Sequence, residues 1–256
     1  MTLPVALVTG ASSGIGACVA DRLAASGRWQ LVLNGRDEER LSQVADRTGG
    51  LILPMELDTV GGALKLAAAT LDLVGEVDLL VANAGIGWAG AFADTPPEMI
   101  DRLLAVNLLA PLHLSRALLP GMVQRGRGHL VFVSSIAGCV AVGGEAVYSA
   151  TKAGLNAFAE SLRYEVGAAT RSGAGSDVRV SVVVPGAVDT PFFERRGSPY
   201  TRGFPDLIPP DQVAETIVRA VGRRRDESFA PGWMRLPARL HGAAPALFRR
   251  LAARFA

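Results

Sequence analysis

Short apolar runs alternate with longer segments of helical periodicity along most of the chain. A continuous apolar run bounded by turn residues is typical of a buried strand, and apolar positions three and four apart are typical of a helix. The pattern predicts strands at residues 5–9, 30–34, 51–57, 77–82, 129–134 and 178–184. It predicts helices at about 14–26, from about 37 onward, and at 61–73, 98–125 and 147–170. Pro111 and Pro120 lie inside the fourth of these helices, where we expect a kink or an early end.

Strands that are apolar throughout and separated by helices indicate a parallel sheet covered on both faces. The predicted fold class is therefore α/β, a doubly wound parallel sheet of Rossmann-like type. No shift in composition divides the 256 residues, and residues 171–177 read as a loop rather than a linker. We expect a single domain over residues 1–256, because this length suits one large α/β domain.

Composition narrows the functional classes. Apolar residues make up 49% of the chain, yet no stretch approaches the ~20 consecutive apolar residues of a membrane span. The N-terminus lacks the features of a signal peptide, and Cys18 and Cys139 provide no disulfide framework. The three histidines form no cluster, so we expect no metal site. No motif supports nucleic-acid binding, and we expect a cytoplasmic protein.

The first predicted strand leads directly into a glycine-rich turn, Thr9-Gly10-Ala11-Ser12-Ser13-Gly14-Ile15-Gly16. Glycines allow a tight turn and a close approach of the backbone to a pyrophosphate. The helix that opens at about Gly14 offers free N–H groups and a partial positive charge at its N-terminus. A three-glycine turn alone is weak evidence, but this one follows a strand and opens a helix. That context predicts a dinucleotide site.

The end of the second predicted strand indicates which dinucleotide binds. An acidic residue there typically binds the ribose 2′-hydroxyl, whereas an arginine accommodates a 2′-phosphate. The segment reads Leu33-Asn34-Gly35-Arg36, with no acid at the strand end. We therefore favour NADP(H) over NAD(H). The alternative is that Arg36 only caps a solvated turn against Asp37 or Glu39.

Tyr148 and Lys152 are one helical turn apart, so their side chains project from the same face of the last predicted helix. A free tyrosine has a pKa of about 10, and a nearby cation favours the phenolate and lowers that pKa. Spacing alone favours a surface tyrosine with a solvated lysine. However, only Lys65 and Lys152 among the 26 basic side chains are lysines, which points to a functional pair.

Together these features resemble the short-chain dehydrogenase/reductase family in its shorter, single-domain form. The resemblance covers most of the chain. It rests on residues 9–16, Asp58, Asn83-Ala84-Gly85, Asn107, Ser134-Ser135, Tyr148 with Lys152, and Pro185-Gly186 with Thr190. Any one of these features occurs by chance, but their joint presence in this order is specific. The resemblance implies an oxidoreductase that uses a nicotinamide cofactor.

The resemblance also implies a role for each matched residue. Tyr148 would be the general acid in ketone reduction and the general base in alcohol oxidation, and Lys152 would lower its pKa and bind the nicotinamide ribose. Ser135 would hold the substrate oxygen, and Asn107 would anchor a water that relays protons from Lys152. Structural alternatives are Ser135 as a helix cap, Asn107 as an internal polar plug and Asp58 as a turn former. The implied cofactor-binding residues are Gly10, Ser12, Ser13, Gly14, Ile15, Gly16, Arg36, Leu57, Asp58, Asn83, Ala84, Gly85, Tyr148, Lys152, Pro185, Gly186, Val188 and Thr190.

The loop after the sixth predicted strand, residues 190–209, should form a lid, because ligands in this architecture bind at the carboxyl ends of the strands. Its aromatic residues favour an apolar or ring-containing substrate. We expect substrate contacts from Trp88, Phe192, Phe193 and Tyr200.

The predicted function is that of an NADP(H)-dependent carbonyl reductase or secondary-alcohol dehydrogenase. Its partner is an apolar or aromatic ketone or alcohol, and we expect a homodimer or homotetramer. The alternatives are an NAD-linked alcohol dehydrogenase and a non-catalytic protein that senses nucleotides or binds at a membrane surface.

Residues 231–256 form a basic tail. Leu247, Phe248, Leu251 and Phe255 recur at helical spacing beside arginines, with Pro245 near the predicted helix start. Such a basic amphipathic helix is able to rest on an anionic membrane. We favour a helix packed on the body of the protein or across a subunit interface, because one short helix binds lipid weakly. The arginines at 223–225 read as the end of a helix.

Overall fold

Seven parallel strands form one sheet in this computed structural model, which describes residues 3–169, 177–201 and 203–252. The spatial order is β3-β2-β1-β4-β5-β6-β7, and every pairing is parallel. The prediction of a doubly wound parallel sheet is confirmed. The strands are β1 (Val5–Thr9), β2 (Gln30–Gly35), β3 (Leu51–Pro54), β4 (Leu79–Ala82), β5 (Arg127–Val133), β6 (Asp177–Pro185) and β7 (Glu227–Ala230).

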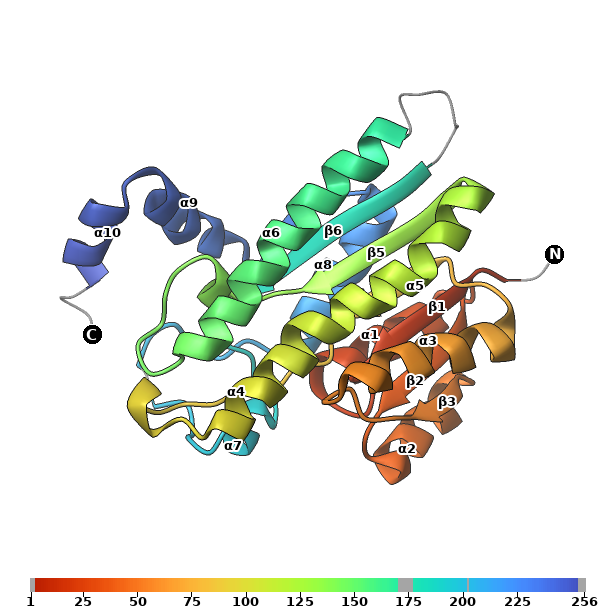
Figure 1. The fold of residues 1–256 in the computed structure, drawn as a ribbon, viewed down its shortest axis with the longest axis horizontal. Coiled ribbons are helices and arrows are strands. Elements are labelled where there is room, and N and C mark those ends of the chain that lie inside the picture. The colour runs from red at the N-terminus through yellow and green to blue at the C-terminus, as the bar shows by residue number, and fades with distance from the viewer. Residues whose placement is uncertain (1–2, 170–176, 202, 253–256) are drawn as a thin grey trace.

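Helices cover both faces of the sheet. Apolar residues of α3, α5 and α6 pack on one face, and those of α1, α2 and α8 pack on the other. Figure 1 shows α5 and α6 in front of the sheet, with α8 behind it. Successive residues of one strand enter opposite layers, which explains why the strands are apolar throughout. The helices are α1 (Gly14–Ala25), α2 (Glu38–Thr48), α3 (Val60–Val74), α4 (Pro97–Leu104), α5 (Ala110–Arg125), α6 (Ala146–Ala169), α7 (Phe192–Arg195), α8 (Pro210–Arg223), α9 (Arg235–Ala243) and α10 (Pro245–Ala252).

The structure corrects the prediction at three elements. The third strand ends at Pro54 rather than at residue 57, and α8 and β7 were not predicted. The strand β7 is short, and its polar first residues give no apolar run to recognise. The arginines at 223–225 do mark a helix end, since α8 ends at Arg223. Of the predicted loop at 171–177, residues 171–176 and the predicted end of a helix at Thr170 lie outside the described residues, whereas Asp177 is the first residue of β6.

The long helix predicted at 98–125 is interrupted by a turn of π-helix, Ala105–Leu109, between α4 and α5. Pro111 follows this turn at the start of α5. Proline has no N–H, and its ring would meet the carbonyl four residues earlier, which here belongs to Asn107. A wider turn accommodates Pro111 at this interruption, whereas α5 continues past Pro120 to Arg125, so the early end expected as one alternative does not occur.

One helical stretch among the described residues, Pro97–Arg125, is long and apolar enough to cross a membrane, with a mean hydropathy of 1.4. Half of its most apolar window is buried inside the protein. In this structure it serves as a core helix, since α5 packs against the sheet.

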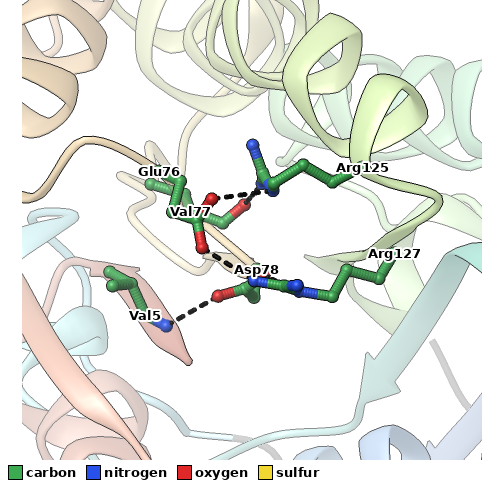
Figure 2. Close-up of polar contacts among 6 residues, drawn as sticks. All are labelled: Val5, Glu76, Val77, Asp78, Arg125 and Arg127. Carbon is green, nitrogen blue, oxygen red and sulfur yellow. Dashed lines mark hydrogen bonds and ion pairs between the residues drawn. The ribbon is translucent and has the colours of Figure 1, made fainter. Parts of the chain in front are cut away.

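An ionic network joins the amino-terminal ends of the central strands, at the edge opposite the carboxyl ends of the strands (Figure 2). The buried Asp78 carboxylate accepts a hydrogen bond from the backbone N–H of Val5 at 3.0 Å and another from Arg127 at 2.9 Å. Glu76 pairs with Arg127 at 2.7 Å and with Arg125 at 3.2 Å. The network links β1 to the start of β5 and holds these strands in register.

The basic tail forms the helices α9 and α10, which lie together at one side of the molecule (Figure 1). Leu236 and Leu240 of α9 are exposed, and so is Trp233, whose ring stacks on that of Phe204 at 5.4 Å. The predicted helix near Pro245 is present as α10. Phe255 and the side chains of Leu247 and Leu251 lie outside the described residues.

Candidate active site

The turn between β1 and α1 is shaped for the close approach of a ligand. Gly10 and Gly14 have φ angles of 66° and 56°, in the left-handed region that favours glycine. A Cβ atom on Gly16 would lie 2.2 Å from the carbonyl oxygen of Gly10, so only glycine fits there. Each of the three predicted glycines therefore has a geometric cause.

Asn83 ties this turn to the end of β4. Its side-chain amide donates to the carbonyl oxygens of Thr9 at 2.9 Å and Gly10 at 3.4 Å. The Thr9 hydroxyl accepts from the backbone N–H groups of Asn83 and Ala84, each at 3.0 Å. Asn83 lines the cleft described below, as predicted, and it also fixes the glycine-rich turn. The role of Thr9 was missed, because the sequence does not show a contact between residues 74 positions apart.

The N-terminus of α1 fits a phosphate group. Its N-cap residue, Ser13, makes no side-chain capping bond, and the first turn contains no acidic residue. The free N–H groups of that turn and its partial positive charge lie at the wall of the cleft, where Gly14 and Ile15 line it. The residues present therefore fit the pyrophosphate of a dinucleotide.

The cleft continues to the carboxyl ends of β2 and β3. Arg36 follows β2 and lines the cleft as an exposed side chain. Asn34, the buried residue near the strand end, donates its amide to the carbonyl oxygens of Leu53 and Met55, both at 3.0 Å. Asp58 also lines the cleft, where it pairs with Arg102 at 3.5 Å. Arg102 was not predicted to belong to the site.

One cleft of about 350 Å³ brings most of the predicted residues together. Gly16 does not line it, because it packs behind the turn against Gly10. Trp88 is also absent from the lining and packs with Tyr148 and Leu103 instead. The predicted residues that do line it are Gly10, Ser12, Ser13, Gly14, Ile15, Arg36, Leu57, Asp58, Asn83, Ala84, Gly85, Ser135, Tyr148, Lys152, Pro185, Gly186, Val188, Thr190, Phe192, Phe193 and Tyr200.

Ser135, Tyr148 and Lys152 meet in this cleft. Ser135 follows β5, whereas Tyr148 and Lys152 lie in the first turns of α6. All three are buried. The Lys152 ammonium donates to the carbonyl oxygen of Val133 at 2.9 Å and lies 5.9 Å from the centre of the Tyr148 ring. The Ser135 hydroxyl also accepts from the backbone N–H of Ala137 at 3.1 Å, so the predicted capping alternative is present beside the predicted catalytic position.

The pKa of Tyr148 contradicts the prediction. Burial raises this pKa to about 12, and the side-chain hydrogen bond with Ser135 opposes the rise without cancelling it. Burial also lowers the pKa of Lys152 to about 8. The expectation that Lys152 lowers the pKa of Tyr148 is wrong for this structure, because desolvation disfavours both charged forms. At neutral pH the phenol is therefore protonated.

Asn107 lies in the π-helical turn and does not line the cleft. Its side chain accepts from the N–H of Ile86 and donates to the carbonyl oxygen of Ile86, both at 2.9 Å. It also donates to the hydroxyl of Thr151 at 3.3 Å. Asn107 therefore holds the loop after β4 against α6, next to Lys152. The water relay stays a prediction.

Aromatic rings line the cleft beyond Tyr148. The ring of Phe192 lies 5.5 Å from that of Tyr148, and Phe193 lies 5.6 Å from Phe192. Tyr200 lies 4.9 Å from Phe193. These four rings make a continuous apolar wall on the side of the predicted substrate.

A buried ion pair braces this wall. The guanidinium of Arg196 pairs with Glu145 at 2.5 Å and lies 4.6 Å from the centre of the Phe193 ring. Only 8% of the Arg196 side chain and 13% of the Glu145 side chain are exposed. Sequence reasoning missed both residues, and the position of Glu145 three residues before Tyr148 was the one available signal. Among the described residues no group of three or more His, Cys, Asp or Glu side chains is placed to hold a metal ion.

A phosphate-binding turn next to a buried proton donor is the arrangement of a Rossmann-type oxidoreductase. Comparison with known families gives the same result: the short chain dehydrogenase model matches residues 4–200. The chain belongs to this family.

Known proteins resemble the chain along most of its length. The dehydrogenase/reductase SDR family member 7B of Xenopus laevis is 34% identical over 95% of this chain and 79% of its own. A short-chain dehydrogenase from Sphingobium yanoikuyae, solved in complex with NADPH, is 30% identical with a TM-score of 0.81, covering 96% of both chains. A Burkholderia phymatum relative in complex with NAD has a TM-score of 0.83 over 96% of this chain and 95% of its own. At 24% identity that last likeness shows the fold alone.

Proposed function

We propose that this oxidoreductase uses NADP(H) to interconvert a ketone and a secondary alcohol on an apolar or aromatic small molecule. The observation that carries the proposal is the position of Tyr148, where the phosphate-binding part of the cleft meets the aromatic wall. A proton donor at that junction suits hydride transfer to a carbonyl, because the carbonyl oxygen takes up a proton in the same reaction.

Arg36 supports the choice of NADP(H). It lies at the end of β2, where an arginine accommodates a 2′-phosphate, and it makes no hydrogen bond or ion pair with the described residues. Asp37, the nearest acid in sequence, is paired with Arg40 at 2.9 Å and caps α2 by accepting from the Arg40 N–H. The Sphingobium relative that binds NADPH is in line with this choice.

Each residue of the site has its own role in the proposed reaction. A bound reduced nicotinamide supplies the hydride. The hydroxyls of Ser135 and Tyr148 hold the carbonyl oxygen, and Tyr148 gives its proton to that oxygen as negative charge develops there. Lys152, fixed by the carbonyl of Val133, stands behind the phenol. The rings of Phe192 and Phe193 bind the apolar part of the substrate and exclude water.

Replacement of Tyr148 tests the proposal. Wild type, Tyr148→Phe and Tyr164→Phe are compared for loss of NADPH absorbance with a panel of steroid, acyl and aromatic ketones. Tyr164 is an exposed tyrosine of the same helix, so its variant is the matched control. We expect Tyr148→Phe to lose turnover by at least about 100-fold while NADPH still binds. Equal turnover of Tyr148→Phe and wild type would support a non-catalytic binding protein.

A second measurement tests the cofactor. Quenching of tryptophan fluorescence is titrated with NADPH and with NADH on the wild-type protein. Tighter binding of NADPH is expected from Arg36. Tighter binding of NADH would favour the NAD-linked alcohol dehydrogenase.

We also propose that the protein works as a cytoplasmic homodimer or homotetramer. The exposed apolar residues of the tail, Trp233, Leu236 and Leu240, are compatible with a subunit contact and with a membrane contact, and we propose the subunit contact because one short helix binds lipid weakly. Sedimentation of full-length protein and of a truncation after Ala230 tests this. An unchanged mass after truncation, together with pelleting on anionic vesicles only when the tail is present, would favour the membrane surface.

A further inference from the structure

Arg195 extends from the lid segment, residues 190–209, to the glycine-rich turn. It is the last residue of α7, and its guanidinium donates to the Ser13 hydroxyl at 3.3 Å. Ser13 is the N-cap residue of α1, yet its side chain makes no capping bond. The lid segment and the phosphate turn therefore touch through two polar groups that lie at the wall of the cleft.

Positive charge gathers at this contact. Arg36 and Arg40 lie close enough to Arg195 to lower its pKa, although burial is the larger cause. Asp37 and Glu194 act in the opposite direction, but Asp37 is already paired with Arg40. Within the described residues, no carboxylate forms an ion pair with Arg36 or Arg195. A ligand anion would neutralise this group of guanidinium ions.

The place of the cluster indicates which anion fits. Arg36 and Arg40 lie just beyond β2, where the adenosine ribose of a dinucleotide carries its 2′ substituent. The pyrophosphate instead belongs at the N-terminus of α1. Arg195 contacts Ser13 at the N-terminus of α1 and is also close enough to Arg36 and Arg40 to interact with them electrostatically, so it adjoins both positions.

We propose that Arg195 binds the 2′-phosphate of NADP(H) together with Arg36, and that this contact holds the lid segment over the cleft. The inference rests on the proposed use of NADP(H). The same short helix carries Phe192, whose ring packs against Tyr148, and it is followed by Arg196, which pairs with Glu145. Binding of the phosphate by Arg195, at the C-terminal end of α7, therefore orders the aromatic wall at the N-terminal end of this helix.

Two adenosine fragments test the contact without any turnover. Calorimetric titration measures the affinity of 2′,5′-ADP and of 5′-AMP, which differ only in the 2′-phosphate. The variants are Arg195→Gln, Arg195→Lys and, as a matched control, Arg239→Gln, an exposed arginine of α9. We expect Arg195→Gln to weaken 2′,5′-ADP binding by about 10-fold and 5′-AMP binding by less than about 2-fold. Arg195→Lys should recover part of the loss, and Arg239→Gln should bind both fragments as wild type does.

Hydrogen exchange tests the coupling to the lid segment. In the wild type, 2′,5′-ADP should slow exchange in residues 190–200 more than 5′-AMP does, and Arg195→Gln should abolish that difference. Unchanged 2′,5′-ADP affinity in Arg195→Gln would overturn the inference while the use of NADP(H) stands. An equal loss for both fragments would also overturn it, because the contact would then be with the 5′-phosphate that both fragments share. Equal binding of the two fragments by the wild type would instead reject the NADP(H) preference itself.

Discussion

Burial of Lys152 should make the free protein less stable at neutral pH, and Lys152→Met should relieve this effect. Burial lowers the pKa of Lys152 from 10.5 to about 8, whereas the unfolded chain keeps the ordinary value. Between these two pH values the unfolded state binds more protons than the folded state, so stability rises as the pH rises through this window. This difference in pKa corresponds to about 3 kcal/mol in the free energy of unfolding. The folded protein is less stable by this amount at pH 7, and the effect is absent above pH 10.5.

The methionine variant removes the charge and keeps much of the volume. It also loses the hydrogen bond to the carbonyl of Val133, which contributes about 1 kcal/mol. At pH 7 the variant should therefore be more stable than wild type by about 2 kcal/mol, and above pH 10.5 it should be slightly less stable. Turnover should be lost throughout, because the residue stands behind the proton donor.

Urea unfolding of the cofactor-free protein between pH 7 and 10.5, followed by tryptophan fluorescence, measures the effect. The control is Lys65→Met, which changes the other lysine of the chain, an exposed residue of α3. It should show the pH dependence of wild type. The reasoning fails if the difference between wild type and Lys152→Met is the same at every pH, or if the variant is the less stable protein at pH 7.

Three further predictions concern the fold and the cleft. Burial lowers the pKa of His129 from 6.5 to about 4. Between these pH values the unfolded chain protonates this histidine and the folded protein does not, so the free energy of unfolding falls by about 3 kcal/mol as the pH falls from 6.5 to 4. His129→Gln should flatten that part of a urea-midpoint profile, and parallel profiles would count against the assignment. Asp78→Ala should cost about 2–4 kcal/mol in chemical denaturation, because it leaves a β1 N–H group without its acceptor. Changing its exposed partner Arg127 to Gln should cost less, because solvent screens an exposed ion pair. Glu145→Gln leaves the buried Arg196 without its counter-ion, so it should raise the KM for ketone by about 10-fold with NADPH affinity unchanged. An unchanged KM would show that this ion pair does not shape the aromatic wall.

The parts of the fold that the sequence predicted are those fixed by local pattern. The strand β1 is apolar on both faces, and β6 contains the run Val182-Val183-Val184, so each stands out from its neighbours. The strand β7 begins with Glu227 and Ser228 and has only four residues, so its pairing with β6 depends on the sheet already being present. The break before Pro111 was predictable from proline chemistry, but the π-helical form of the turn was not.

The residues of the site also differ in whether a local sequence pattern marks them. Gly10, Ser135 and Tyr148 belong to short motifs whose spacing is visible in the chain, and the structure brings them to one cleft. Arg195 and Glu145 act through partners that are far away in sequence, so no local pattern marks them. What the sequence cannot weigh is the balance between a nearby charge and burial, which is why the sign of the Tyr148 pKa shift was wrong.

That balance bears on the direction of the proposed reaction. Spacing places Lys152 and Tyr148 on one face, but the ammonium turns to the carbonyl of Val133 and the ring remains 5.9 Å away. With the pKa of Tyr148 at about 12, forming the phenolate at pH 7 costs about 7 kcal/mol in the cofactor-free protein. Reduction of a ketone needs the protonated phenol, which is the form already present, whereas oxidation of an alcohol needs the phenolate. The pKa of the buried phenol therefore predicts that the rate of alcohol oxidation increases more with pH than the rate of ketone reduction does.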